Sequence, residues 1–343
     1  MRCPTIKELP VPPDGKTGWP WIEESPQSKE SMIVGSRWPR ISIITPSLNQ
    51  ANYLEETIRS VLLQGYPNLE YIIIDGGSTD HSIEIIKRYG NWLTYWISES
   101  DYGQSHAINK GFTKASGDIY AYLNSDDLYE PEALKSIAAE YVTEGRPHLL
   151  AGECIIIKEQ SLKRSFKPWW PSNLSYFIRK TFSSTFAQPA SFWTKNIFNQ
   201  LGGFDESLNY CFDKEFFLRA GLRGITPHFV PKKIARFREH SDSKTMKHGI
   251  KFHKETIKIL CKHSSSCGID NNGEKKIKKN IENEIKYIEI FSLWKKKSRK
   301  YGILYYLKMV LYSPSLLLQR KILGQGRRLF FYKTKNVDEL KVI

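Results

Sequence analysis

The chain has few cysteines and no long uninterrupted apolar run. These absences argue against a disulfide-rich secreted protein and against a membrane-spanning protein. Its five cysteines are scattered over 343 residues, so we expect reduced thiols in a cytoplasmic setting. The N-terminal residues contain prolines and charges where a signal peptide has its apolar core. The longest apolar stretch near the C-terminus, residues 302–318, is broken by Lys308 and Pro314, which argues against a membrane span.

Acidic residues are scarce in the last hundred positions. The net charge is +15, and residues 244–343 hold 24 Lys and Arg against 8 Asp and Glu. Such tails suit anionic membranes or nucleic acid. A lysine-rich run at 295–300 precedes the apolar and aromatic residues 301–318, so we expect peripheral contact with an anionic membrane, on its inner face. The tail contains no recognisable nucleic-acid module, which disfavours a nucleic-acid partner.

Apolar strands alternate with helical patterns from residue 39 onward. Strands are predicted at 41–45, 69–74, 93–98 and 119–123, with amphipathic helices between them. This alternation predicts an α/β fold with a Rossmann-like, mostly parallel nucleotide-binding sheet. Residues 148–158 add another strand or two, and residues 160–240 form an aromatic-rich half with a helix near 213–220.

Three regions are predicted along the chain. Residues 1–38, rich in Pro, Gly, Ser and charge, form an extended lead-in. Residues 39–245 form the catalytic domain. Residues 246–343 form a basic, mostly helical C-terminal region that lies against a membrane.

Two acidic loops follow strands that are predicted to be buried. Residues 75–80 follow the apolar run 71–74, and residues 124–127 follow 119–123. Ligands of open α/β sheets bind outside the carboxyl ends of the strands. Neighbouring carboxylates repel each other unless a cation, a shared proton or a donor-rich ligand compensates. The two loops therefore indicate a nucleotide held with a divalent metal.

Four motifs occur in order along residues 40–245. They are ISIITPSLN at 41–49, DGGSTD at 75–80, SESDYGQ at 98–104 and NSDD at 124–127. Together they resemble the motifs of glycosyltransferase family 2. The resemblance implies the A-type glycosyltransferase fold (GT-A), a nucleotide-diphosphate-sugar donor, a divalent cation and inversion at the anomeric carbon. It does not identify the sugar, and we favour UDP as the nucleotide.

The first three motifs are assigned by this resemblance to the nucleotide. The predicted nucleotide-binding residues are Thr45, Pro46, Ser47, Asn49, Asp75, Gly76, Ser78, Asp101, Gly103, Gln104 and Asn109. Asp75 would accept a hydrogen bond from the imide N–H of uracil. The alternative for these segments is an ordinary strand–turn–helix with capping side chains.

The fourth motif resembles the metal-binding motif of the family, which would hold Mg²⁺ or Mn²⁺. Its first acidic position is Asn124 here, so we take Asp126 as the direct ligand. Asp127 is expected to contact donor or acceptor. The segment 238–244 resembles the part that closes the site, with His240 as a metal ligand and Lys244 as a diphosphate contact.

The general base is predicted at Asp213, because Phe212-Asp213 is followed six positions later by Arg219 as in the family. Glu215 is the rival base. Gln188 and Trp193 belong to the acceptor-side segment 188–193, for which an aromatic core strand is the alternative. The expected reaction is a single displacement by a hydroxyl of a saccharide or lipid-linked acceptor, in polysaccharide or glycoconjugate synthesis.

Two other classes compete with this interpretation. A nucleotidyltransferase usually has a basic Gly-rich loop after its first strand, and residues 45–50 contain no basic residue. A non-catalytic protein that binds a sugar nucleotide or nucleic acid is the second alternative. The presence of Asp126, Asp127 and Asp213 argues against it.

Overall fold

The computed structural model describes residues 1–29, 31–32, 37–143, 148–158, 161–170, 187–240, 243–244 and 248–297. The chain divides into two compact units, residues 1–246 and 247–343, and each is described by itself. The three functional regions expected from the sequence stay predictions. The expected membrane contact at 295–318 lies outside the described residues, except that 295–297 end a helix.

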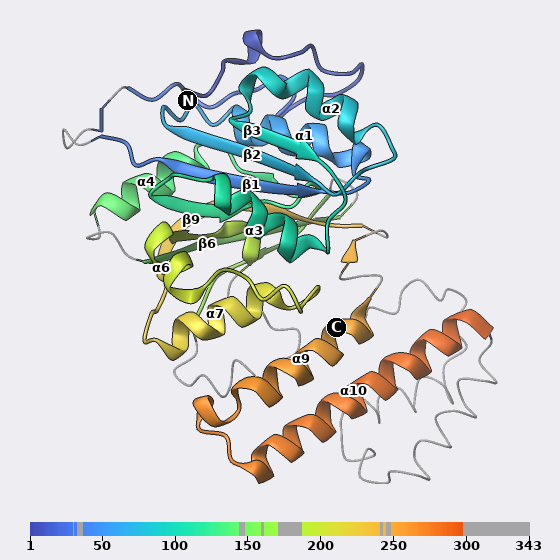
Figure 1. Cartoon of the computed structure of the whole chain (residues 1–343). Helices are drawn as coiled ribbons and strands as arrows, with labels where there is room; N and C mark the ends of the chain where they lie inside the picture. Colours follow the sequence, from blue (N-terminus) through green and yellow to red (C-terminus); the bar gives the residue numbers. More distant parts are fainter. Residues whose placement is uncertain are drawn as a thin grey trace. The chain divides into compact units, whose positions relative to one another are not determined.

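The first unit is built on a mixed sheet, nine-stranded within the described residues, in the order β3-β2-β1-β4-β8-β6-β9-β5 with β7 beside β6 (Figure 1). The strands are β1 (Ile41–Ser47), β2 (Leu69–Asp75), β3 (Tyr95–Ser98), β4 (Ile119–Tyr122), β5 (Leu128–Tyr129), β6 (Leu149–Lys158), β7 (Ser161–Phe166), β8 (Ser191–Thr194) and β9 (His228–Glu239).

The N-terminal half of this sheet is parallel, as predicted. β1 pairs in parallel with β2 and β4, and β2 pairs in parallel with β3. Ser47 lies opposite Asp75, and Asp75 lies opposite Ser98, so three carboxyl ends meet at one edge. The other half is mixed, because β8 is antiparallel to β4 and β6 while β9 is parallel to β6 and antiparallel to β5.

Helices cover both faces of the parallel half (Figure 1). They are α1 (Ala51–Leu62), α2 (Ser82–Tyr89) and α3 (Gln104–Lys114). In the mixed half α4 (Ala133–Thr143) packs on β9, α6 (Lys195–Leu201) packs on β8, and α7 (Phe212–Leu222) packs on α6. Ile43 and Ile73 share a core with Leu54 of α1 and Ile137 of α4. On the opposite face α3 approaches β1 closely at Gly111, where an added Cβ would lie 2.5 Å from Cγ2 of Ile44.

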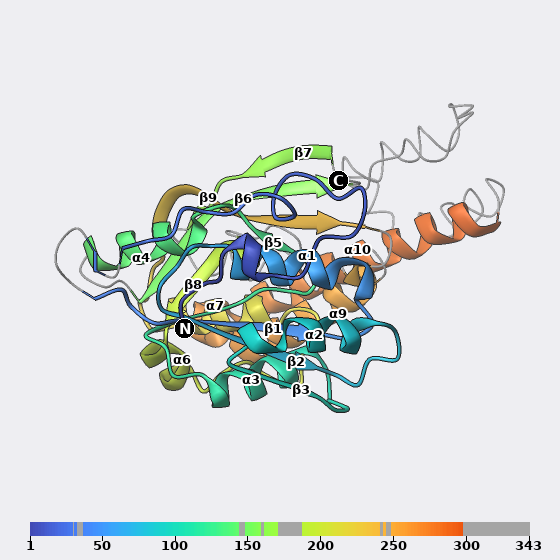
Figure 2. The same cartoon turned by 90° about the horizontal axis from the view of Figure 1, so that it is seen from above.

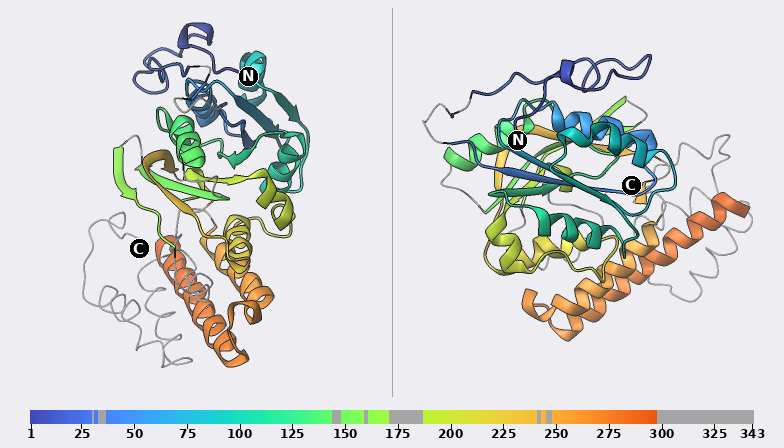
Figure 3. Two further views of the ribbon diagram at one scale, coloured as in Figure 1. Left: turned by 90° about the vertical axis from the view of Figure 1, so that its left-hand side faces the viewer. Right: turned by 45° about the horizontal axis from the view of Figure 1, so that its top comes forward.

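The N-terminal arm, residues 1–29, contacts the rest of the first unit at several points (Figure 3, dark blue). Cys3 N donates to Tyr66 O at 2.9 Å, and Trp19 Nε1 donates to Tyr129 O at 2.8 Å. Trp19 and Trp21 are buried. The lead-in predicted as extended is therefore joined to the core by backbone hydrogen bonds and tryptophan side chains.

Local details differ from the sequence prediction at three places. Pro46 does not end the first strand, because β1 continues in register to Ser47. The third strand begins at Tyr95 and not at residue 93, because the 3₁₀ helix Gly90–Trp92 ends just before Leu93. Residues 160–240 are more regular than expected, and the long strand β9 (Figure 2) was not predicted. Its alternation is obscured by a proline and several basic residues, so pairing with β6 rather than local pattern defines it.

The second unit is helical where it is described, as expected. α9 (Gly249–His263) and α10 (Asn271–Lys297) are joined by the short helix η4 (Ser265–Cys267). Ile259 and Leu260 of α9 and Ile277 and Ile281 of α10 are buried. Among the described residues, no helix is long and apolar enough to cross a membrane.

Candidate functional site at the carboxyl edge of the sheet

Asp75 organises the loop that follows β2. Its fully buried carboxylate accepts four hydrogen bonds, from Gly77 N (3.1 Å), Ser78 N (2.8 Å), Ser78 Oγ (2.6 Å) and Ser98 Oγ (2.7 Å). Three of these bonds reach Oδ2 and one reaches Oδ1, so Oδ1 has room for a further donor. The predicted contact with a uracil imide stays a prediction, while a loop-forming role is observed.

Asn49 joins the loop after β1 to the loop after β2. It has a left-handed φ of 53°, which asparagine tolerates better than most residues. Its N–H donates to Ser78 Oγ at 2.8 Å, and its Oδ1 accepts from Thr79 N at 2.8 Å. Asp80 accepts from Ala51 N, the first residue of α1, at 3.0 Å. Hydrogen bonds thus join the loops after β1 and β2, and the side-chain acceptor at the start of α1 comes from Asp80 and not from the Asn49 side chain expected in the capping alternative.

The β1 positions differ in what they can reach. Thr45 is fully buried, and its hydroxyl lies 3.1 Å from Tyr71 Oη, so its side chain belongs to the core and not to the loop edge. Pro46 is also buried in the strand. Ser47 Oγ is buried and has no hydrogen-bond partner among the described residues. Of these three predicted nucleotide residues, Ser47 therefore has the hydroxyl with unused hydrogen-bonding capacity.

The third motif packs directly on the second. Gly103 N donates to Asp101 Oδ1 at 2.8 Å, and a Cβ on Gly76 would lie 2.6 Å from Asp101 Oδ2. Gly103 has a φ of 122°, and a Cβ there would meet Asn209 Oδ1 at 2.4 Å. Gly103 needs glycine for its φ, and at Gly76 a larger residue would push the Asp101 carboxylate aside.

Asn109, a further predicted nucleotide residue, holds a distant segment in place. Its Nδ2 donates to Phe204 O at 2.9 Å and to Glu206 Oε1 at 2.8 Å, and its Oδ1 accepts from Phe204 N at 2.9 Å. These bonds fasten α3 to the chain that leads into α7. The structure thus gives Asn109 a positioning role between two halves of the unit.

A polar network connects the acidic loop 124–127 to three other segments. Lys244 Nζ donates to Gln104 Oε1 at 2.7 Å, and Gln104 Nε2 donates to Asn124 Oδ1 at 2.6 Å. Asn124 Nδ2 donates to Asp127 Oδ2 at 3.3 Å and to Gln188 Oε1 at 3.5 Å. Both ends of the Asn124 amide are therefore engaged by protein groups, which agrees with choosing Asp126 over Asn124 as the metal ligand.

Asp126 and His240 form a close pair across this edge. His240 Nε2 lies 2.9 Å from Asp126 Oδ2, and the two side chains are 10% and 19% exposed. Since a carboxylate only accepts, Nε2 carries the proton. Nδ1 of His240 is buried and has no partner among the described residues.

This pair fits a divalent cation in part. Histidines that bind metals usually donate their other N–H to a carboxylate, and Nδ1 is the unpaired nitrogen. Within the described part of the chain, no group of three or more His, Cys, Asp or Glu residues could hold a metal. Nδ1 lies on the side of the ring away from Asp126, so in this arrangement Asp126 would support a cation bound to His240, and joint binding by both side chains would require their hydrogen bond to be replaced. Diphosphate oxygens and water would have to complete the coordination.

Asp127, the residue after Asp126, is fully buried. Arg238 N donates to its Oδ1 at 2.9 Å. Burial, and next the charge of Asp126, raise the pKa of Asp127 well above its usual range. The carboxyl group is enclosed by Asn124 and the backbone of β9, and its expected contact with donor or acceptor stays a prediction.

Residues of α1 complete the site, and the sequence analysis missed them. Arg238 Nη2 lies 2.9 Å from Glu56 Oε2, and its Nε donates to Asp126 O at 3.0 Å. The guanidinium lies 5.1 Å from the centroid of the Tyr53 ring, which also packs on His240 at 4.5 Å. Tyr53 and Glu56 are three positions apart on one helix face just after the first motif, and this spacing was the available signal.

Asp213 lies in the first turn of α7, where the helix dipole stabilises negative charge. Its Oδ1 accepts from Lys214 N at 2.7 Å. Burial, and next the charges of Asp213 and Asp127, raise the pKa of Tyr122 well above its usual range. Asp213 is thus close enough to the end of β4 to influence Tyr122, the residue two positions before Asn124.

Glu215, the rival base, is fully buried. Its Oε2 lies 2.8 Å from Arg219 Nε, and Arg219 also donates to Gly203 O at 2.7 Å and to Leu201 O. A buried carboxylate held by a guanidinium is a poor proton acceptor because the cation stabilises its charged form. The structure therefore favours Asp213 over Glu215 as the base.

The acceptor-side segment divides into one polar and one core residue. Trp193 is fully buried, with ring centroids of Phe216, Phe204 and Phe112 at 5.3, 5.8 and 6.0 Å. The structure thus gives Trp193 the aromatic core position that the sequence left as the alternative. Gln188 instead joins the polar network described above.

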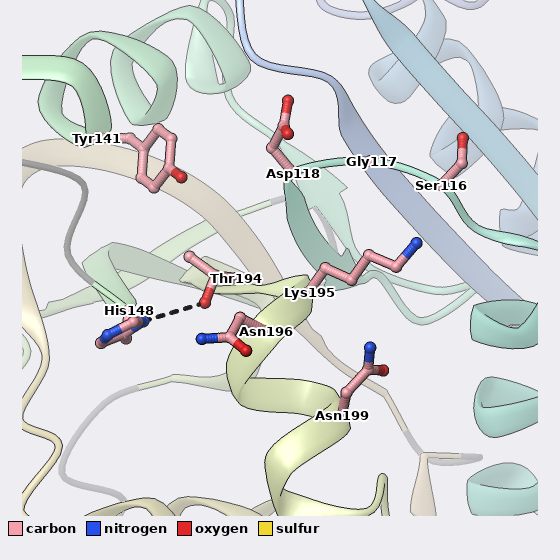
Figure 4. Close-up of a pocket in the computed structure, with 9 residues that line it drawn as sticks. All are labelled: Ser116, Gly117, Asp118, Tyr141, His148, Thr194, Lys195, Asn196 and Asn199. Carbon is pink, nitrogen blue, oxygen red and sulfur yellow. Dashed lines mark hydrogen bonds between the residues drawn. The ribbon is translucent and has the colours of Figure 1, made fainter.

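A pocket of about 490 Å³ opens at the opposite edge of the sheet (Figure 4). It lies where Gly117 and Asp118 precede β4 and Lys195 begins α6, and Figure 4 shows the hydrogen bond between His148 and Thr194 on one side of it. No residue of the predicted site lines this pocket. The candidate site is therefore defined by its motifs and hydrogen bonds.

Comparison with known proteins agrees with the motifs. A model of the family described as "Glycosyl transferase family 2" matches residues 42–196. An uncharacterized glycosyltransferase of Mycobacterium tuberculosis is 31% identical over 187 residues, which are 54% of this chain and 70% of that protein.

Solved structures share the fold. TarS of S. aureus in complex with UDP-GlcNAc aligns with a TM-score of 0.55 and 17% identity, covering 84% of this chain and 81% of that one. In a longer TarS structure the matched part is only 49% of the TarS chain. The mannosyltransferase PcManGT of Pyrobaculum calidifontis, in complex with GDP-Man and Mn²⁺, aligns with a TM-score of 0.51 and 16% identity, covering 92% and 88%.

Three findings point to the same family. They are the order of the motifs, the α/β sheet with its GT-A neighbours, and the relative that is matched over most of its length. The chain belongs to glycosyltransferase family 2.

Proposed function

We propose that this glycosyltransferase is an inverting enzyme that transfers a sugar from a UDP-sugar to a hydroxyl of a saccharide or lipid-linked acceptor. The contact between Asp126 and His240 is the observation that carries the proposal. It joins the acidic motif to the segment that, by resemblance, closes the site over the donor. A non-catalytic binding protein would have no need for this pair beside a carboxylate at the start of α7.

The donor would lie along the loops after β1, β2 and β4. Ser47 Oγ is available to it, and Lys244, at the rim of the network, would neutralise the diphosphate. Asp126 and His240 would hold Mg²⁺ or Mn²⁺, which when bound stabilises the charge of the leaving diphosphate. One structural neighbour is described in complex with Mn²⁺. The neighbours are described with UDP-GlcNAc and GDP-Man, so the preference for UDP rests on the motifs.

Asp213 would take the proton from the acceptor hydroxyl as that oxygen attacks the anomeric carbon. It lies in the first turn of α7, where the helix dipole favours negative charge. The displacement is a single step, so no protein nucleophile is needed. The basic C-terminal region would bring a lipid-linked acceptor to an anionic membrane, in polysaccharide or glycoconjugate synthesis.

The test is a thermal-stability panel with UDP-, GDP- and TDP-sugars, each in Mn²⁺ and in EDTA. Ligands that bind the native state raise the melting temperature. Stabilisation by UDP-sugars that disappears in EDTA is the expected result. Stabilisation by another nucleotide class would show that UDP is not the donor nucleotide. Stabilisation that persists in EDTA would show that donor binding needs no metal. A folded sample with no shift would support the non-catalytic alternative.

A further inference from the structure

Three buried polar side chains follow one another at helical spacing on α1 and just beyond its end. They are Thr57, Ser60 and Gln64, and none is exposed to solvent. Buried polar groups need hydrogen-bond partners. Helix α1 carries these residues on one face because positions three to four apart lie above one another. We refer to Thr57, Ser60 and Gln64 as the polar stripe.

The polar stripe binds the backbone of the segment that begins in the acidic motif. Thr57 Oγ1 lies 2.9 Å from Ser125 O and 2.8 Å from Asp127 O, so one hydroxyl proton is shared by two carbonyls. Ser60 Oγ accepts from Tyr129 N at 3.2 Å. Gln64 Nε2 donates to Glu130 O at 2.9 Å. Each member thus holds a successive part of residues 125–130.

The same helix contacts the other half of the Asp126–His240 pair. Tyr53, four residues before Thr57, packs on the His240 ring at 4.5 Å. Thr57 holds the two carbonyls on either side of Asp126. Helix α1 therefore sets the distance between the two groups that would bind the cation, one through a ring contact and one through the backbone.

The N-terminal arm fixes this arrangement from outside. Arg59 of α1 is fully buried and donates to Pro10 O (2.9 Å), Pro20 O (3.1 Å) and Trp21 O (2.8 Å) of the arm. Trp19 Nε1 donates to Tyr129 O at 2.8 Å. The arm thus holds α1 and the segment after the acidic motif at the same time.

We propose that Thr57 is a positioning residue of the glycosyltransferase site, whose hydroxyl fixes the backbone on both sides of Asp126 so that its carboxylate meets His240. The role in catalysis rests on the proposed function. The positioning itself is a property of the protein without ligand and can be measured there.

The experiment compares hydrogen exchange of the full chain in the wild type and in Thr57→Val, which removes the hydroxyl at nearly constant volume. Exchange in residues 124–130 is expected to become about tenfold faster, the factor set by losing one ordinary hydrogen bond, while β1 and β2 keep their protection. Thr57→Ser retains the hydroxyl and should exchange like the wild type. Thr113→Val is the matched control, because Thr113 is exposed and its hydroxyl donates within its own helix, to Lys110 O.

Unchanged exchange in 124–130 of Thr57→Val would overturn the proposal, as would equal acceleration across the whole unit. If the valine variant does not fold, Thr57→Ala against Thr57→Ser gives the same comparison. UDP with Mn²⁺ is the second probe: its dissociation constant should rise about tenfold in Thr57→Val and stay unchanged in Thr57→Ser. If the wild type does not bind UDP, the proposed donor is wrong, while the exchange result still decides the role of Thr57.

Discussion

His240 Nε2 and Asp126 Oδ2 lie 2.9 Å apart, although 114 positions separate the two residues in the chain. Asp126 follows β4, and His240 follows β9, which reaches this edge by pairing with β5 and β6. The contact leaves Nδ1 of the imidazole buried and without a partner among the described residues. The contact links Asp126, the proposed metal ligand of the acidic loop, to the segment that is expected to close over the donor.

Replacing the proposed base tests the chemistry. We expect Asp213→Asn to lower the transfer rate by about 10²- to 10⁴-fold, the usual contribution of general base catalysis, without changing stabilisation by UDP-sugar. Product formation and the melting temperature are measured on the same sample. Glu215→Gln is the contrasting variant: it breaks the buried contact with Arg219, so it should lower the melting temperature. Transfer by Asp213→Asn at a rate near that of the wild type would exclude Asp213 as the base.

Removing the imidazole tests the cation site. We expect His240→Asn to raise the Mn²⁺ concentration for half-maximal stabilisation by UDP about 10- to 100-fold. In EDTA the melting temperature of the variant should differ from that of the wild type only by the effect of losing the ring contact with Tyr53. His81→Asn is the matched control, because the His81 side chain is 90% exposed. An unchanged Mn²⁺ requirement in His240→Asn would show that this residue does not bind the metal.

The arm should contribute measurably to stability through Arg59. Its guanidinium is fully buried and donates to three arm carbonyls and to Tyr89 Oη. Arg59→Met leaves these acceptors unpaired, which we expect to cost about 3 kcal/mol. For a unit of this size that corresponds to a drop of about 6–12 °C in melting temperature. Arg88→Met removes a half-exposed guanidinium that pairs with Glu55 and should cost less than about 1 kcal/mol; equal losses would refute the assignment.

Asp127 should make stability fall as the pH rises. Its pKa is raised in the folded protein by burial and by Asp126, so the unfolded chain releases this proton first. Between the unfolded pKa of about 3.9 and the higher folded value, the native state binds more protons, and stability decreases by at most about 1.4 kcal/mol per pH unit. Melting temperatures in EDTA from pH 5 to 8 measure the slope.

Asp127→Asn is the control for this pH dependence. The amide keeps an oxygen for Arg238 N and cannot ionise, so the melting curve of the variant should be flatter over the same range. A slope identical to that of the wild type would assign the pH dependence to other groups.

Several elements could be predicted from local pattern. The runs 41–45 and 69–74 alternate with amphipathic helices. The structure confirms β1 and β2 as parallel neighbours and α1 and α3 as helices. Asp75 ends β2, and Asn49 and Asp80 lie in the loops after β1 and β2, so their place at the carboxyl edge was predictable as well. What they contact was not: the donors to Asp75 come from its own loop and from Ser98.

Burial separated true edge residues from core residues within the same motifs. Thr45 and Trp193 lie in segments that resemble the family, and Glu215 was the rival base, yet all three side chains are enclosed. Sequence gives the residue type at a position, while enclosure depends on what other elements place over it. Tyr71 covers Thr45, phenylalanines of α3, of α7 and of the loop between α6 and α7 surround Trp193, and Arg219 covers Glu215.

The sequence by itself determined the family, the alternating α/β order and the residues available at the ends of the strands, because these depend on short-range periodicity and on motifs. Only the tertiary structure decided that β9 lies between β6 and β5 and brings Arg238 and His240 to Asp126. It also decided that α1 and the arm hold the acidic loop by its backbone. Backbone carbonyls are the same at every position, so no side-chain pattern reveals which of them a distant hydroxyl will meet.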